Sequence, residues 1–139
     1  MISFKEYLEE KKDPNRTDVT AWLVLHTANK IILGKRSASS NNPNQWNFFG
    51  GHVDKGETPA AAAARELFEE TSYKLDPSTL KQISVIGNAH YFSAKINNPN
   101  AVKTTGEISK VTSYKLTDLP NNLHLKTQNF FDKLDDLLQ

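Results

Sequence analysis

The sequence predicts an α+β fold in which a mixed β-sheet is packed between helices as an α/β/α sandwich. Segments rich in β-forming residues and segments with helical periodicity are mixed along the chain without regular βαβ alternation. With 139 residues, 37% of them hydrophobic and 24% charged, the composition is that of an ordinary globular protein. We therefore expect a single domain spanning positions 1–139, whose core forms without disulfides.

The N-terminal stretch, positions 1–14, predicts a short helix or a packed arm. Phe4, Tyr7 and Leu8 stand at helical spacing, and the turn-forming sequence Asp13-Pro14-Asn15 ends the pattern.

Three strands are expected between this arm and the central helix. β-forming residues and polar turns alternate as follows: strands at 19–26, 30–33 and 46–53, a turn at Ala28-Asn29 and a polar loop at 37–44. The first two strands are expected to form a hairpin. Gly50-Gly51 is expected to interrupt the third.

A helix start follows at Thr58-Pro59. Thr58 can cap the free N–H groups of the first turn, and Pro59 loses nothing at the first helical position, where its missing N–H would have had no partner. The alanines at 60–64 favour helix strongly, and we expect the helix to reach about Thr71.

The rest of the chain predicts further strands and a closing helix. In order, we expect a turn at 76–78, strands at 82–87, 89–96 and 107–116, a loop at 97–100 and a C-terminal helix over 122–139. The helix is indicated by the periodic spacing of its apolar residues: Leu123, Phe130, Phe131, Leu134, Leu137 and Leu138.

Charge and cysteine content limit the classes of function. A formal net charge of +1 gives no electrostatic reason to expect nucleic acid or membrane as a partner. The absence of cysteine excludes disulfides, thiolate nucleophiles and cysteine zinc sites. Neither a signal-peptide core nor an apolar run of membrane-spanning length occurs, so we expect a cytoplasmic protein.

An acidic cluster on the central helix carries the chemical signal. Glu66, Glu69 and Glu70 stand at i, i+3 and i+4, so their carboxylates share one helix face, and Arg65 can offset only one of these charges. Hard divalent cations would relieve the surplus, which indicates Mg²⁺, with Mn²⁺ as a substitute. The plain alternative is a solvated acidic helix face. Gly51 and Glu57 at fixed spacing favour the site, because six such positions recur by chance on the order of once in 10⁷ starts.

This spacing resembles the Nudix box: Gly, five residues, Glu, seven residues, then Arg-Glu-apolar-x-Glu-Glu-x-Gly-apolar. The match runs from Gly51 to Tyr73, with Ser72 in place of the final glycine. That glycine helps the chain leave the helix, often at positive φ. The resemblance is closest in character to MutT-like nucleoside triphosphate pyrophosphohydrolases, and it implies the Nudix sandwich with its catalytic loop and helix after the Gly50-Gly51 strand.

Flanking segments extend the likeness to about residues 19–120. Residues 31–36 resemble the second strand of the family, and 46–51 resemble its Trp-x-x-Pro-Gly-Gly approach, with Phe49 replacing the proline. Residues 107–119 resemble a late strand, with Ser113 where tryptophan is common.

The resemblance implies roles for the residues of the box. Glu66, Glu69 and Glu70 would ligate the metal together with the backbone carbonyl of Gly50. Arg65 would orient a catalytic glutamate. Glu57, in the loop before the helix, would support the geometry of the loop and helix or hold a water molecule.

Two residues outside the box match positions that act in some members, and Phe48 is a further candidate. Glu107 corresponds to an additional ligand or general base, with a surface glutamate as the alternative. Arg36 corresponds to a substrate-phosphate contact, with an exposed arginine as the alternative. Phe48 is expected to pack the sheet together with Phe49, although one ring could line a base pocket. His52 is interpreted as a loop residue rather than a ligand.

The implied reaction is metal-dependent hydrolysis of a diphosphate linkage in a small nucleotide-type substrate. A nucleoside triphosphate, oxidised or not, leads by elimination, since accessory motifs for NADH and coenzyme A are absent and Asn88 replaces the proline associated with ADP-ribose. Nucleotide sugars and dinucleoside polyphosphates stay close alternatives. A non-catalytic nucleotide-binding module is a different-class alternative, which the intact glutamates disfavour. An mRNA-decapping role has no support from the net charge of +1. A homodimer is left open.

Overall fold

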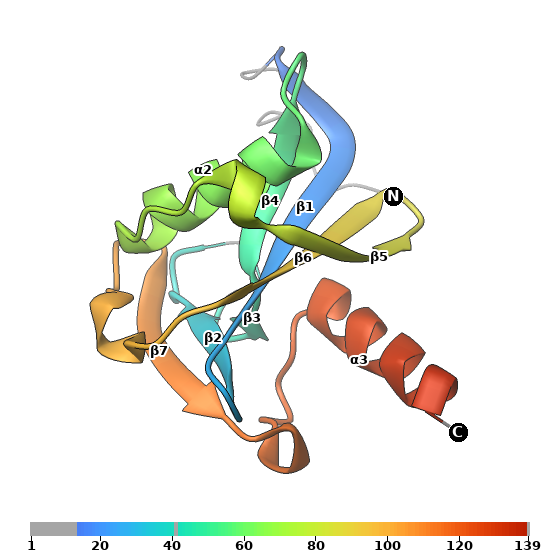
Figure 1. Cartoon of the computed structure of the whole chain (residues 1–139). Coiled ribbons are helices and arrows are strands. Elements are labelled where there is room, and N and C mark those ends of the chain that lie inside the picture. The colour runs from blue at the N-terminus through green and yellow to red at the C-terminus, as the bar shows by residue number, and fades with distance from the viewer. Residues whose placement is uncertain (1–13, 41, 139) are drawn as a thin grey trace.

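The computed structural model describes residues 14–40 and 42–138. Their regular elements, coloured along the chain in Figure 1, are β1 (Arg16–His26), β2 (Ile31–Arg36), β3 (Trp46–Asn47), β4 (Phe49–Asp54), α2 (Pro59–Thr71), β5 (Lys81–Ile86), β6 (Ala89–Lys95), β7 (Ile108–Tyr114) and α3 (Leu125–Leu138). Short 3-10 turns lie at Pro77–Thr79, Pro99–Ala101 and Leu116–Asp118. Most of the predicted arm at 1–14 lies outside the described residues.

One mixed sheet contains all the strands of the described part of the chain. Its order is β3-β2-β1-β6-β5, with β4 also paired to β1 and β7 to β2. The pairing of β1 with β6 is parallel, and the other strand pairs are antiparallel. The predicted hairpin is confirmed, since Leu25 faces Ile32 and His26 faces Ile31.

Strand β1 shows why both faces of the sheet are covered. Ala21, Leu23 and Leu25 belong to one buried cluster, which includes apolar residues of α2. Trp22 and Val24 belong to another, which includes Phe residues of α3. Since neighbouring side chains of a strand point to opposite faces, the run at 21–25 of β1 is apolar on both faces, and α2 and α3 lie on opposite sides of the sheet (Figure 1). The α+β sandwich with a mixed sheet is thus confirmed.

Helix α2 begins where the sequence predicts. Thr58 accepts a hydrogen bond from the backbone N–H of Ala61 at 3.1 Å, and Pro59 occupies the first turn. The helix ends at Thr71. Ser72 then adopts the left-handed conformation at φ 63°, and its N–H donates to the Phe68 carbonyl at 2.8 Å. Serine therefore takes the helix exit that glycine would take more readily.

Replacing this serine is expected to stabilise the protein. Ser72→Gly should raise the free energy of unfolding by about 0.5–1 kcal/mol, because glycine adopts positive φ without the steric penalty that a Cβ brings. Urea unfolding measures the change. Ser72→Ala is the matched control, since it removes the hydroxyl and keeps the Cβ. An equal gain from both variants would contradict the conformational explanation.

The structure corrects two predicted boundaries. The last helix begins at Leu125 and not at 122, because backbone groups before it pair with β3: the Trp46 N–H donates to Asn122 and the His124 N–H donates to Trp46, both at 2.8 Å. The strand predicted at 46–53 breaks at Phe48 and not at Gly50-Gly51. The Phe48 N–H leaves the sheet to donate to Thr127 Oγ1 at 3.0 Å, so both glycines lie within β4.

In the described range, neither helix has both the length and the apolar character to cross a membrane.

Candidate active site

The box places helix α2 directly against strand β4. A Cβ added at Gly51 would lie 2.8 Å from Cδ of Glu66, and one added at Gly50 would lie 2.1 Å from the Ala21 carbonyl oxygen. Any larger residue at these positions would displace the Glu66 carboxylate or separate β4 from β1. The two glycines are therefore required by close approach: one admits the helix carboxylate and the other admits the neighbouring strand.

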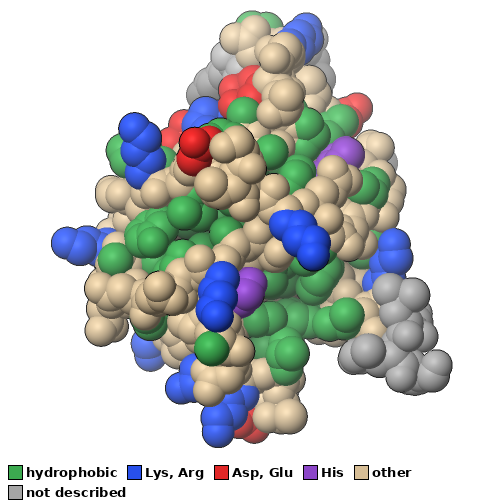
Figure 2. Space-filling model, viewed as in Figure 1, with side chains coloured by type: hydrophobic (Ala, Val, Ile, Leu, Met, Phe, Trp, Pro, Cys, Tyr) green, Lys and Arg blue, Asp and Glu red, His purple; other side chains and the backbone are tan. Residues whose placement is uncertain are grey.

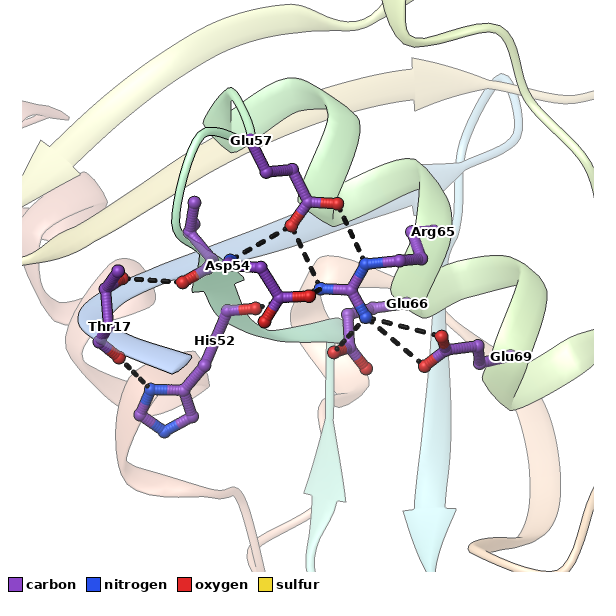
Figure 3. Close-up of polar contacts among 8 residues, drawn as sticks. Thr17, His52, Asp54, Glu57, Arg65, Glu66 and Glu69 are labelled. Carbon is purple, nitrogen blue, oxygen red and sulfur yellow. Dashed lines mark hydrogen bonds and ion pairs between the residues drawn. The ribbon is translucent and has the colours of Figure 1, made fainter. Parts of the chain in front are cut away.

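Arg65 is the centre of the polar network beneath the helix (Figure 3). Its Nε donates to Glu57 Oε2 at 2.8 Å and its Nη2 to Glu57 Oε1 at 3.0 Å, which makes a two-point ion pair. Nη2 also donates to the His52 carbonyl at 3.1 Å. This arrangement ties the helix to the end of β4, and the partner carboxylates raise the pKa of the guanidinium further above its usual value.

Glu57 holds the loop between β4 and α2 as well. Its Oε1 accepts a hydrogen bond from the backbone N–H of Asp54 at 3.1 Å. The hydrogen bond from Arg65 keeps the pKa of Glu57 below its usual value, against the opposing effect of burial. Glu57 is thus an ionised structural partner in the described network, which agrees with the supporting role expected for it.

Glu70 is the most deeply buried carboxylate of the box. The residue is 4% exposed, and its Oε1 accepts a hydrogen bond from the Gly50 N–H at 2.9 Å. Burial raises the pKa of Glu70 well above its usual value, and the charges of Glu66 and Glu107 add to the rise. The hydrogen bond from Gly50 and the charge of Arg36 act in the opposite direction without cancelling it.

Glu66 is intermediate in burial between Glu70, which is buried, and Glu69, which is exposed. Burial raises its pKa to about 7, although Arg65 lowers it by charge and by a hydrogen bond of 3.1 Å. Glu69 has a side chain 55% exposed and forms an ion pair of 3.3 Å with Arg65. The three carboxylates share a helix face as predicted, yet they differ in burial.

The structure also brings Glu107 and Arg36 to this cluster. Glu107 is exposed just before β7, and its charge raises the pKa of both Glu66 and Glu70. Arg36 ends β2, and the Ser37 N–H that follows it donates to the Glu107 carbonyl at 2.9 Å. Two residues distant in sequence from the box therefore lie near enough to interact electrostatically with its acids: Glu107 with Glu66 and Glu70, and Arg36 with Glu70.

Phe48 occupies a different environment from the one its substrate-binding role requires. The residue is 2% exposed, and its ring contacts those of Tyr91, Phe130 and Phe131 at centroid distances of 6.2, 5.4 and 5.5 Å. With α3 in place, no face of the ring is open to a ligand. Its alternative interpretation as a packing residue fits the structure, and we do not retain Phe48 as a substrate contact.

Sequence reasoning missed two residues that border the site. Asp54 Oδ2 lies 3.5 Å from Nη2 of Arg65 and adds a further carboxylate to the network. His124 lies against Trp22 of β1, with ring centroids 5.8 Å apart. The role of Asp54 could have been inferred from the sequence, because it lies three residues before Glu57 in the same loop. The position of His124 could not, because its contact with Trp22 joins residues far apart in the chain.

The carboxylate and carbonyl oxygens of this cluster are of the kind that bind divalent cations. No group of three or more His, Asp or Glu side chains in the described residues stands in an arrangement that could itself hold a metal ion. However, burial raises the pKa values of Glu66 and Glu70, and the charges of neighbouring acids add to the rise. A cation would compensate this negative charge, and oxygen donors are those that Mg²⁺ and Mn²⁺ prefer.

The mixed sheet, helix α2 against β4, and the acidic network around Arg65 are the features that the sequence pattern predicts for a Nudix domain. The sequence profile of the NUDIX domain matches residues 14–134, and the chain therefore belongs to this family.

Individual relatives match over shorter segments. An RNA pyrophosphohydrolase of Pelagibacter ubique is 48% identical over 52 residues, which cover 37% of this chain and 32% of the relative. An 8-oxo-dGTP diphosphatase of Escherichia coli is 33% identical over 55 residues, 40% of this chain and 43% of the relative. The chain thus matches less than half the length of either curated relative.

Solved structures share the fold over most of the chain. A MutT NUDIX hydrolase from Burkholderia pseudomallei has a TM-score of 0.69 and 23% identity, covering 82% of this chain and 95% of its own. A Caenorhabditis elegans Ap4A hydrolase has a TM-score of 0.62 and 24% identity, covering 86% and 97%. At these identities the likeness concerns the fold alone.

Proposed function

We propose that this protein is a pyrophosphohydrolase that cleaves a diphosphate linkage in a small nucleotide-type substrate with Mg²⁺, for which Mn²⁺ can substitute. The observation that carries the proposal is the pair Glu70 and Glu66: Glu70 is buried and bonded by the Gly50 N–H, Glu66 is half-buried against Gly51, and burial raises the pKa of both. An acidic cluster that only faced solvent would not be buried in this way, so the solvated-face alternative is disfavoured.

The metal would be held by oxygen donors of the box: Glu66, Glu69, Glu70 and the carbonyl of Gly50, with Glu107 as a further donor from the loop before β7. When bound, divalent ions neutralise the charge of a diphosphate and lower the pKa of a coordinated water. The network around Arg65 already fixes the positions of two of these acids. Arg65 bonds Glu66 at 3.1 Å and Glu69 at 3.3 Å.

Proton transfer is assigned to the carboxylates of the same cluster. With a cation bound, Glu66, Glu69 and Glu70 would be ionised ligands, so a carboxylate beside them is better placed to accept the proton of the attacking water. Glu107, which is exposed and electrostatically coupled to Glu66 and Glu70, is the candidate for this base. Arg36 would contact substrate phosphate from the end of β2, beside Glu70.

For the substrate we propose a nucleoside triphosphate, oxidised or not, cleaved to the monophosphate and pyrophosphate. The similarity to a protein named 8-oxo-dGTP diphosphatase supports this choice. Dinucleoside polyphosphates and nucleotide sugars remain alternatives, the former supported by the fold of the Ap4A hydrolase. The similarity to an RNA pyrophosphohydrolase adds a triphosphorylated RNA end as a probe. On the face in Figure 2, Lys and Arg side chains stand apart and form no continuous basic surface. The net charge of +1 likewise gives no electrostatic reason to expect nucleic acid as the substrate. We also propose a cytoplasmic location.

A substrate panel tests the proposal. The panel contains ordinary and oxidised nucleoside triphosphates, a nucleotide sugar, diadenosine tetraphosphate and 5′-triphosphorylated RNA, each with Mg²⁺. We expect nucleoside monophosphate plus pyrophosphate from a triphosphate, and no turnover by Glu69→Gln or Glu70→Gln. Exclusive cleavage of another substrate would replace the triphosphate assignment. No activity on any diphosphate, or full activity in both variants, would overturn the enzymatic function and favour a nucleotide-binding module.

A further inference from the structure

His124, which precedes α3, contacts three parts of the fold at once. Its Nδ1 accepts a hydrogen bond from the Lys126 N–H at 3.1 Å, and its carbonyl accepts from the N–H of Thr127 at 3.0 Å. Its Nε2 lies 3.3 Å from the side-chain amide of Asn42, in the loop after β2. The imidazole is therefore a helix N-cap that also reaches a distant loop.

These contacts define the protonation state of the ring. A backbone N–H can only donate, so Nδ1 must carry a lone pair and the neutral imidazole holds its hydrogen on Nε2. The Asn42 atom that faces Nε2 at 3.3 Å is the amide nitrogen Nδ2, which cannot accept a hydrogen bond. Rotating the amide by 180° exchanges its nitrogen and oxygen, and the Nε2–H then donates to Asn42 Oδ1. A doubly protonated ring would turn a second donor toward the Lys126 N–H and lose the cap.

The charged surroundings favour the same neutral form. Burial, together with the nearby charges of Arg36, from β2, and Lys126, from α3, lowers the pKa of His124 to about 4. At neutral pH the ring therefore carries no charge of its own against Arg36.

The loop that His124 contacts is also the loop that holds Arg36. The Arg36 N–H donates to the Gln45 carbonyl and the Asn44 N–H donates to the Arg36 carbonyl, each at 2.9 Å. Asn122, two residues before His124, donates from its side chain to the Asn44 carbonyl at 2.8 Å. The backbone of Arg36 is thus hydrogen-bonded to the loop at 44–45, and Asn122, in the segment before α3, is hydrogen-bonded to the same loop.

A second path runs from His124 to the box. The His124 ring contacts Trp22, and Trp22 pairs with Gly50 in the sheet. A Cβ added at Gly50 would lie 2.7 Å from Cε3 of Trp22, so the indole packs directly on the strand that carries the predicted metal-binding carbonyl. His124 is thus linked to Gly50 through the side chain of Trp22, and to the backbone of Arg36 through the loop at 42–45.

We propose that neutral His124 is a positioning residue for substrate binding: it joins β1, the first turn of α3 and the loop at 42–45, and thereby fixes the backbone that carries Arg36. This inference rests on the proposed function, because Arg36 is the residue expected to contact substrate phosphate. His124 itself touches no reacting group in this account.

Two measurements without substrate test the positioning. The imidazole ¹⁵N shifts of His124 should show the Nε2–H tautomer at pH 7, with a titration near pH 4. Amide exchange at Arg36 and Asn44 should be about three- to tenfold faster in His124→Asn, which keeps a short capping group and loses the reach to Asn42. An Nδ1–H or charged ring at pH 7, or unchanged exchange in this variant, would overturn the proposal.

Kinetics on the substrate found in the panel give a separate test. His124→Asn and Asn42→Ala should each raise KM about three- to tenfold, as expected for one hydrogen bond, with kcat within about twofold. The control Asp132→Asn, on the exposed side of α3, should change neither. A fall in kcat at constant KM, or wild-type KM in both variants, would contradict positioning of Arg36. If wild-type protein cleaves nothing, the proposed function fails, while the substrate-free measurements still decide the role of His124.

Discussion

Glu70→Gln is expected to abolish turnover and yet to stabilise the metal-free protein. The substitution keeps an oxygen for the Gly50 N–H, which now donates to Glu70 Oε1 at 2.9 Å, and it removes a charge from a residue that is 4% exposed. We expect kcat to fall by at least about 10²-fold, because a neutral amide is a poor ligand for a hard cation. We expect the free energy of unfolding in EDTA at pH 8 to rise by about 1–3 kcal/mol.

The pH dependence of stability follows from the same residue and from Glu66. Both have folded pKa values above the ordinary 4.5, so between pH 4.5 and the folded values the native state binds more protons than the unfolded state. The stability of metal-free protein should therefore fall as the pH rises from 4.5 through about 7, the pKa of Glu66. Glu70→Gln should flatten part of this fall, and Mg²⁺ should raise the stability of wild type more than that of the variant.

Glu69→Gln is the matched control, since it makes the same chemical change on the same helix at a side chain 55% exposed. It should lose activity without gaining stability in EDTA. Urea unfolding at pH 5 and pH 8, with EDTA or Mg²⁺, measures all three proteins. A Glu70→Gln variant less stable than wild type at pH 8 without metal would show that the buried charge of Glu70 does not destabilise the folded protein.

Arg65→Lys is the second substitution with a large expected effect. Lysine keeps the positive charge, but it cannot make the two-point ion pair with Glu57 while also bonding the His52 carbonyl at 3.1 Å. The acids around it would lose most of the hydrogen bonds that the guanidinium donates. We expect a loss of about 2–3 kcal/mol in the free energy of unfolding, together with a fall in kcat, because Glu66 and Glu69 lose their shared partner.

A double-mutant cycle with Glu57→Gln isolates this pair. If the two-point contact carries the effect, the losses from Arg65→Lys and Glu57→Gln should be strongly non-additive when urea unfolding is measured on both single variants and the double variant. Wild-type stability in Arg65→Lys, or additive losses, would mean that the charge of Arg65 matters and its geometry does not.

The sequence predicts the parts of this protein that depend on local rules. The cap at Thr58 and the proline after it define the start of α2, and the spacing of Glu66, Glu69 and Glu70 defines their common face. A run of β-forming residues indicates β1. These features require only neighbours in the chain, and the structure has them where the pattern indicates.

Features that depend on contacts across the fold could not be predicted. The unequal burial of Glu70 and Glu69 arises because β4 lies beneath only one side of α2, and the late start of α3 arises because Asn122 and His124 pair with Trp46. Phe48 leaves the sheet to meet Thr127, 79 positions away. None of these partners is visible from local periodicity.

The central claim is that the acidic cluster on α2 is a metal-dependent hydrolytic site, and one measurement tests it most directly. Product release from the nucleotide panel is followed for wild type and Glu70→Gln, first with Mg²⁺ and then after excess EDTA. The account predicts that wild type turns over a diphosphate substrate with Mg²⁺, stops in EDTA, and resumes when Mg²⁺ is restored, while Glu70→Gln stays inactive throughout. Turnover by wild type that persists in EDTA, or by Glu70→Gln at the wild-type rate, would contradict it.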